Sequence, residues 1–124
     1  MSMIDTPLMR GLEHVLDVSA FRHQIIAANL ANIDTPGYRT RDLRPFAGEI
    51  ERAMAGKESS FASFTPIAHE IRGLLERPDG NNVSVERESL LLAQNQLRFQ
   101  VAVQFMKAEF HRMTLAITGG GTTA

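Results

Sequence analysis

The sequence predicts an all-α fold in which a long N-terminal helix and a long C-terminal helix pack as an antiparallel coiled-coil-like pair. Near each end, apolar residues recur at steps of three and four over many turns, and each run is bounded by capping and turn residues. The stretch between them lacks this period, so we expect it to be extended or loosely ordered. The 124 residues suit a single domain, 1–124, with a helix at about 7–33, an irregular middle at 34–83 and a helix at about 85–117.

The N-terminal helix has a recognisable start and end. Thr6 is a good N-cap, and Pro7 fits the first helical position because its missing N–H has no partner there in any case. Pro36 disfavours a helical conformation at Thr35, and Pro-Gly suits the centre of a type II turn. At 1.5 Å per residue the helix would be about 40 Å long. The residues expected on its packing face are Met9, Leu12, Leu16, Ile26, Leu30 and Ile33.

The C-terminal helix follows the turn cluster Asp79-Gly80-Asn81-Asn82. Ser84 can cap it, which places Glu86 and Glu88 in the first turn, where the helix dipole favours anions. The apolar seam extends over about four heptads, a length typical of coiled coils. The residues expected to face the first helix, within or between subunits, are Leu92, Phe99, Val103, Met106, Phe110, Met113 and Ile117.

Apolar residues also lie off these two stripes, where a pair of helices alone would leave them in water. Exposed apolar faces of several hundred Å² usually mark an interface, so the sequence predicts a chain that packs against neighbours. These off-stripe residues are Val15, Val18, Phe21 and Ile25 on the first helix and Leu90, Leu91, Leu97, Val101 and Phe105 on the second.

Composition argues against several classes of function. The formal net charge is −1, with no basic patch of the kind that binds nucleic acid, and the chain has no cysteine for disulfide or thiolate chemistry. The four histidines lack metal-ligand spacing, and His23, on the apolar stripe, is expected to be packed or interfacial. No nucleotide-binding or nucleophile motif occurs. We therefore expect no enzyme activity, no metal and no cofactor.

The sequence shows neither the pattern of a cleaved signal peptide nor a candidate membrane span. The first residues lack the basic and apolar regions of a cleaved signal peptide, and no apolar run approaches the roughly 18 residues of a membrane span. If the protein leaves the cytoplasm, we expect a route that needs no cleaved signal.

Helix packing does not explain two asparagines near the end of the first helix. Asn29 and Asn32 are three residues apart and share a face, although asparagine is a poor helix former. Either the helix frays toward the turn, or the polar pair hydrogen-bonds to a neighbouring chain and fixes register, as a buried asparagine does in coiled coils. In the second case we expect this region to contact neighbouring subunits.

The same stretch carries a family resemblance. Asn29-Leu30-Ala31-Asn32, followed by Thr35-Pro36-Gly37-Tyr38, resembles the N-terminal signature of bacterial flagellar rod and hook proteins. Asp79-Gly80-Asn81-Asn82-Val83 resembles a segment typical of the proximal-rod members, and Arg41-Asp42-Leu43 fits them too. The resemblance covers most of the chain and is weakest between Arg52 and Arg77. Within the middle, Phe46–Met54 suits a short helix, and Ser59–Thr65 has no match in the family.

The resemblance implies a structural subunit of the flagellar rod, the drive shaft of the basal body in the periplasmic space. It implies export in an unfolded state through the flagellar type III apparatus, and terminal helices that form the core of the tube. Expected partners are other copies of the chain, neighbouring rod proteins, the adaptor protein FliE and the membrane ring. The alternatives are another axial subunit or a helix lying on a membrane surface, which the balanced charges of the C-terminal helix disfavour.

Overall fold

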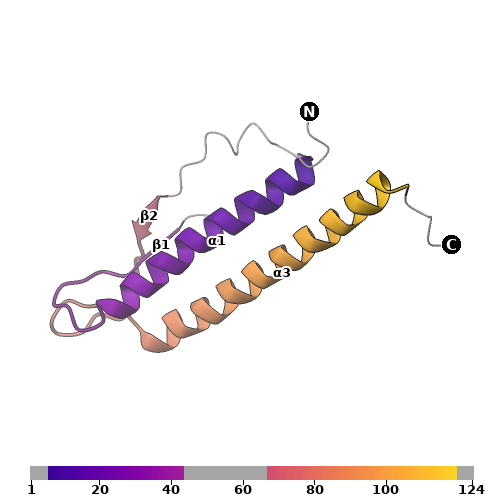
Figure 1. Ribbon diagram of the computed structural model, residues 1–124. Coiled ribbons are helices and arrows are strands. Elements are labelled where there is room, and N and C mark those ends of the chain that lie inside the picture. Colours follow the sequence, from indigo (N-terminus) through magenta and orange to yellow (C-terminus); the bar gives the residue numbers. More distant parts are fainter. Residues whose placement is uncertain (1–5, 44–66, 120–124) are drawn as a thin grey trace.

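The computed structural model describes residues 6–43 and 67–119. Within them lie helix α1 (Pro7–Ala31), strand β1 (Arg41–Leu43), strand β2 (Ala68–Glu70) and helix α3 (Val85–Ile117). The two helices run antiparallel, side by side along the length of α1 (Figure 1). The predicted short helix at Phe46–Met54 and the unmatched stretch Ser59–Thr65 lie outside the described residues.

Both helices begin where the capping residues predict. The Thr6 hydroxyl accepts a hydrogen bond from the Met9 amide at 3.1 Å, with Pro7 at the first helical position. The Ser84 hydroxyl accepts one from the Arg87 amide at 3.3 Å. Each cap satisfies an amide that has no partner inside the helix, which fixes the start of the helix in the sequence.

Helix α1 ends two residues before the predicted Ile33, because Asn32 closes it. The backbone N–H of Asn32 reaches the carbonyls of Ala28 and Asn29, and its side-chain amide donates to the Ala28 carbonyl at 2.8 Å. The Thr35 hydroxyl then donates to the Asn32 side-chain oxygen at 3.0 Å. Asn32 therefore caps the last turn, because its backbone and side-chain N–H groups bond the last carbonyls of the helix.

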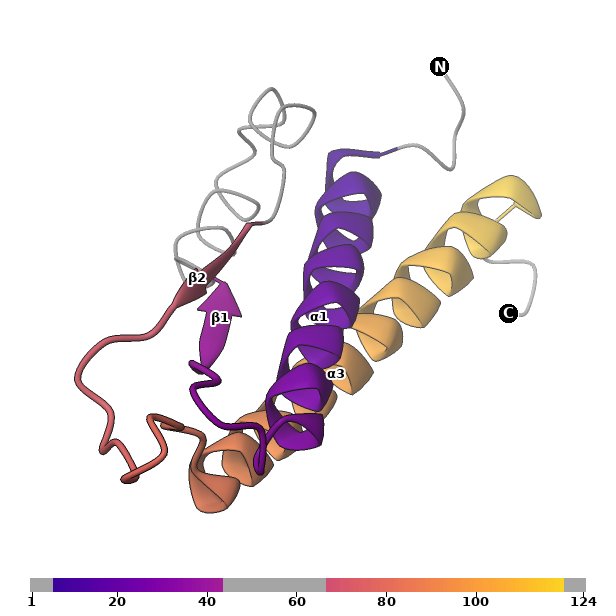
Figure 2. The ribbon, with the colours of Figure 1, turned by 90° about the vertical axis from the view of Figure 1, so that its left-hand side faces the viewer.

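The middle of the chain contributes a small antiparallel strand pair. Arg41 lies opposite Glu70, and Leu43 lies opposite Ala68. The pair packs on the side of α1 away from α3, so α1 is covered on two faces (Figure 2).

This strand pair corrects one expectation from the sequence. The second apolar face of the first helix was expected to be unburied, but Val18 is 3% exposed and forms a buried cluster with Ile25 and Leu43. Phe21 and Ala68 pack against the same cluster. The expectation was wrong for α1 because it considered the helix pair alone, and the chain's own strands cover this face.

Helix α3 presents a partly polar seam to α1. Its most buried residues recur every seven positions, as in a heptad repeat, and include two carboxylates and an amide. They are Glu88, Asn95, Ala102 and Glu109, followed by Met113. The apolar stripe inferred from the sequence lies on one flank of this seam. Leu92, Val103 and Met106 are half-buried, while Phe99, Phe110 and Ile117 are exposed in the single chain.

The packing residues inferred on α1 are covered to different extents. Met9 is 2% exposed and Ile26 is 1% exposed, so both belong to the core. Leu12, Leu16, Leu30 and Ile33 are half-buried.

A buried ion pair attaches β1 to α1. The Arg22 guanidinium donates two hydrogen bonds to the Asp42 carboxylate, from Nε at 3.0 Å and from Nη2 at 2.9 Å. The two side chains are 9% and 8% exposed. This two-pronged geometry fixes orientation as well as distance, so it sets how the strand pair sits on the helix.

We expect Asp42→Ala to destabilise the fold by roughly 3 to 5 kcal/mol, because it removes the carboxylate that accepts two hydrogen bonds from the buried Arg22 guanidinium. Urea unfolding of the purified chain, followed by circular dichroism, measures the change. Glu70→Ala is the matched control, since Glu70 pairs with Arg39 at an exposed site and its loss costs less than about 1 kcal/mol. Equal losses in the two variants would contradict the assignment of Arg22–Asp42 as the attachment point.

Candidate functional site

Two turns that are far apart in the sequence meet at one end of the helix pair. Residues 35–38 follow α1 and residues 79–83 precede α3. The two turns lie side by side, next to the end of α1 and the start of α3 (Figure 1). The Gly37 amide donates to the Asp79 carbonyl at 2.9 Å. We call this contact region, residues 29–41 together with 77–88, the turn junction. It unites the two motifs on which the family resemblance depends.

Glycines permit the close approach. Gly37 has φ +74°, and the Tyr38 amide donates to the Thr35 carbonyl at 3.2 Å, which confirms the predicted type II turn. Gly80 has φ +86°, and a Cβ there would lie 3.4 Å from the Gly37 Cα. Both positions therefore require a residue that adopts positive φ, and the space between the turns is narrow.

Asn81 joins the second turn to the first. Its side-chain amide donates to the carbonyls of Asn32 and Thr35, each at 2.9 Å. Its side-chain oxygen accepts from the Val83 amide at 2.8 Å. Asn81 is fully buried, and it gives these two carbonyls a second partner beside the backbone amides of Thr35 and Tyr38. Its side chain thereby fastens the second turn to the first.

Asn82 joins the second turn to the approach to β1. Its side-chain oxygen accepts from the Thr40 amide at 2.6 Å, and the Thr40 hydroxyl donates to the Asn82 carbonyl at 3.2 Å. Thr40, Asn82 and Val83 are all buried. The segment 81–83, just before α3, is therefore hydrogen-bonded both to the turn after α1 and to the residue before β1.

Asn29 lies at the centre of the turn junction and uses its full hydrogen-bonding capacity within the chain. Its amide nitrogen donates to the Arg41 carbonyl at 2.8 Å and to the Glu88 carboxylate at 3.0 Å. Its oxygen accepts from the Tyr38 hydroxyl at 3.0 Å and from the Arg41 amide at 3.2 Å. A side-chain amide has two N–H donors and two acceptor lone pairs, so Asn29 is fully satisfied.

Glu88 and Tyr38 complete this polar centre. Glu88 is fully buried and also accepts from the Arg87 guanidinium at 2.7 Å. Burial raises the pKa of the Tyr38 hydroxyl above its ordinary value of 10.0; the Glu88 carboxylate raises it further, while the positive charge of Arg41 opposes this. The tyrosine hydroxyl therefore stays protonated at neutral pH and donates a hydrogen bond to the Asn29 side-chain oxygen.

Several residues of the turn junction were not singled out from the sequence. Arg77 donates to the Val83 carbonyl at 3.0 Å and also to the Ile33 carbonyl. Arg39 contacts Glu70, Glu76 and the Gly80 carbonyl. Glu88 was interpreted only as a residue favoured at a helix start. The contacts that bring them to the junction span long stretches of the chain: 59 positions from Glu88 to Asn29, 31 from Arg39 to Glu70 and 44 from Arg77 to Ile33. In the sequence, only the two turn motifs pointed toward this region.

The chemistry of the junction is that of a structural joint. Its centre consists of amides, a phenol and a carboxylate that satisfy one another and the backbone. Among residues 6–43 and 67–119, no group of three or more His, Asp or Glu side chains is arranged to hold a metal ion. In the same ranges, no helix is long and apolar enough to cross a bilayer.

Comparison of the sequence with known proteins identifies relatives of this chain. A family model described as "Flagella basal body rod protein" matches residues 22–39, the stretch that includes Arg22, Asn29 and Tyr38. The flagellar basal body rod protein FlgB of Salmonella typhimurium is 30% identical over 130 residues, which cover 90% of this chain and 94% of that protein. The chain belongs to the FlgB family.

More distant FlgB proteins show the same coverage. FlgB of Escherichia coli is 28% identical over 130 residues, and FlgB of Bacillus subtilis is 28% identical over 122 residues; each alignment covers 90% of this chain and 94% of the relative. The similarity thus spans both helices and both turns.

Asn81→Ala is expected to destabilise this FlgB-family chain by about 2 kcal/mol, because the two hydrogen bonds that join the turns are lost and the buried Val83 amide loses its side-chain partner. Asp34→Ala is the control, since Asp34 is exposed in the neighbouring turn and such surface changes usually stay within about 0.5 kcal/mol. Thermal unfolding followed by circular dichroism compares the two. A melting temperature unchanged in Asn81→Ala would contradict the bracing role of Asn81.

Tyr38 offers a direct optical test of the buried centre, because it is the only tyrosine and the chain has no tryptophan. We expect the near-ultraviolet absorbance of the folded chain to report a phenol pKa above 10.0, returning to its ordinary value in denaturant. Because the folded pKa is raised, the corresponding stability is fully present below pH 10.0 and is lost as pH rises through the folded pKa. Tyr38→Phe should remove this part of the alkaline destabilisation; an ordinary pKa in the folded chain would contradict the burial.

Proposed function

We propose that this chain is a structural subunit of the proximal rod of the bacterial flagellum, and that it transmits torque within the drive shaft without catalysing a reaction. The observation that carries the proposal is the similarity to FlgB rod proteins over 90% of the chain. The family is structural, so the function depends on shape, stiffness and contacts with neighbours.

The uncovered face of α3 supports a role in assembly. Leu90 is 60% exposed, and Leu97 and Phe105 are each 61% exposed in the single chain. Among the described residues, the strand pair lies against α1 on the side away from α3 (Figure 2). An apolar helix face without intramolecular cover is typical of a surface that packs in an assembly.

The hydrogen bonds of the turn junction and the buried Arg22–Asp42 ion pair support a mechanical role. A shaft subunit must keep its two helices in a fixed relation while neighbours push on it. Asn29 and Asn81 tie the end of α1 to the start of α3, and Arg22 ties α1 to β1 through a buried ion pair. Each tie uses directional hydrogen bonds, which resist sliding and rotation more than apolar contacts do.

The proposed partners follow from a position in the rod. They are other copies of the chain, neighbouring rod proteins, the adaptor protein FliE, the membrane ring and, during assembly, the flagellar type III export apparatus. The proposed location is the basal-body rod in the periplasmic space, reached without a cleaved signal peptide. Immunodetection of the chain in purified basal bodies of the organism that encodes it tests the location, and absence from them contradicts it.

Val103→Asp tests the role of the helix faces in assembly. Val103 is half-buried on one flank of α3, so a carboxylate there would be forced against apolar neighbours in a packed rod. We expect export of the variant into the medium to persist while rods and motility are lost. Asp17→Asn, at an exposed position of α1, should leave both intact.

Circular dichroism of the purified variants shows whether each retains the helix content of the original chain. Normal swimming of cells that carry only Val103→Asp would contradict the proposed assembly role.

A further inference from the structure

The middle of α3 combines exposure with an almost complete lack of charge. Residues 89–106 contain a single charged side chain, Arg98. Most of the remaining polar groups are side-chain amides, which both donate and accept hydrogen bonds and carry no net charge. These amides are Gln94, Asn95, Gln96, Gln100 and Gln104.

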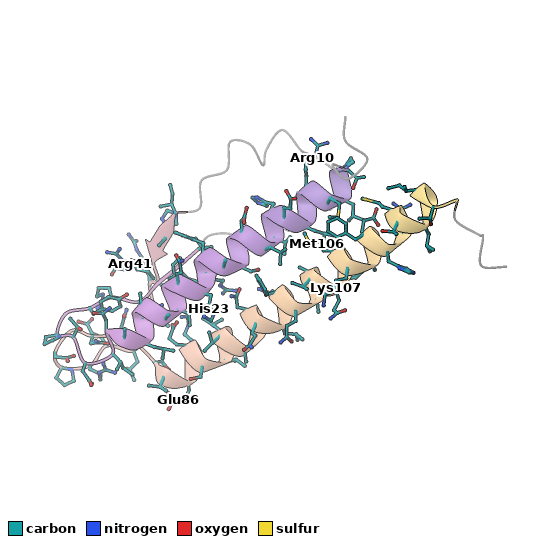
Figure 3. The ribbon with its side chains drawn as sticks, in the orientation of Figure 1. Arg10, His23, Arg41, Glu86, Met106 and Lys107 are labelled. Atoms are coloured by element: carbon teal, nitrogen blue, oxygen red, sulfur yellow. The ribbon has the colours of Figure 1, made fainter. Side chains whose placement is uncertain are left out.

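One flank of this segment forms a groove with α1. The groove has a volume of about 470 Å³, and its walls include His23, Leu92 and Phe99. His23 lies on the part of α1 that runs alongside α3 (Figure 3). We call it the α1–α3 groove. It is large enough to admit side chains of another molecule.

The floor of the α1–α3 groove is polar and incompletely bonded. Ser19 is fully buried and Asn95 is 1% exposed. The Asn95 nitrogen donates to the Ser19 carbonyl at 2.8 Å, but the Asn95 side-chain oxygen and the Ser19 hydroxyl have no hydrogen-bond partner in the described part of the chain. Both oxygens are buried beneath the surface of the groove. The polar groups that a docked side chain meets are therefore those of the rim, the exposed amides of Gln24 and Gln96.

The opposite flank of the same segment projects outward. Leu97, Val101 and Phe105, spaced by four residues, form a ridge of the kind that packs into a groove between helices. They are 61%, 43% and 61% exposed. Gln100, Gln104 and Ala108 line the same surface, which has no charged residue. We call it the α3 ridge.

The groove and the ridge face in nearly opposite directions. At about 100° per residue, positions two apart, such as Phe99 in the groove and Val101 on the ridge, point about 160° apart. One chain therefore cannot satisfy its own groove with its own ridge, but each copy carries both halves of a contact.

We propose, building on the proposed rod function, that the α3 ridge of one copy docks into the α1–α3 groove of the next. Leu97, Val101 and Phe105 would cover Leu92 and Phe99. The side-chain amides of Gln100 and Gln104 would hydrogen-bond to those of Gln24 and Gln96 at the rim of the groove. Both surfaces are apolar with embedded amide chemistry, and the only ionisable side chain lining either of them is His23. A head-to-tail contact of this type does not close on itself and generates a helical array.

Cysteine cross-linking tests the contact, because the natural chain contains no cysteine. Gln24 lines the groove and Gln104 lines the ridge, and both are exposed, so Gln24→Cys and Gln104→Cys leave the core untouched. The double variant would be expressed as the only copy in the organism that encodes the chain. Its basal bodies would be purified, oxidised and run on a non-reducing gel.

We expect a ladder of dimers and higher multimers from the double variant and monomer alone from each single variant. The matched control pairs Gln104→Cys with Asp17→Cys, an exposed α1 position outside the groove lining, and should give no ladder. Adding Val101→Asp to the double variant should abolish all bands above the monomer.

The possible failures are distinguishable. Absence of the cysteine-free chain from basal bodies would contradict the rod function and, with it, this contact. Basal bodies that contain the double variant without a ladder, or with a cross-link only to a different protein, would overturn the contact and leave the rod function standing. Dimers from a single variant would indicate a two-fold contact and would likewise overturn the head-to-tail arrangement.

Discussion

The buried amide of Asn29 is the constraint on which the rest of this structure depends. Its four hydrogen bonds reach the Tyr38 hydroxyl, the backbone of Arg41 and the Glu88 carboxylate. These groups belong to the turn after α1, to β1 and to the first turn of α3. A buried amide is stable only when its donors and acceptors are paired, so the three segments must come together for any one of them to be placed.

The two helices are buried to different extents by the rest of the chain. Helix α1 is sheltered by α3 on one side and by the strand pair on another, with Arg22 and Asp42 fixing the strands. Among the described elements, helix α3 packs chiefly against α1, and it extends over 33 residues against 25 for its partner. The unequal shelter makes α3 the element that presents apolar surface to neighbours, as an assembly subunit requires.

The polar residues buried between the two helices reduce apolar burial but fix the register of the helix pair. Placing Glu88, Asn95 and Glu109 at positions that face α1 forfeits apolar burial that leucine would provide. In coiled coils a buried polar residue specifies register, because a shifted pairing would leave it unsatisfied. Glu88 bonded to Asn29 and Asn95 bonded to Ser19 fix the register in this way. The larger apolar side chains then fall on the flanks of α3, where they remain available to other subunits.

The sequence alone determined the two helices, their caps and the turns that bound them, because these depend on neighbours within about four residues. Thr6, Ser84 and Gly37 behave as local rules predict. The local pattern also singled out Asn29 and Asn81, but not their partners. Which face of α3 meets α1, and that β1 covers Val18, were decided only by tertiary structure. The physical reason is that hydrogen bonds across 59 and 76 positions, from Asn29 to Glu88 and from Asn95 to Ser19, outweigh the apolar period of a single helix.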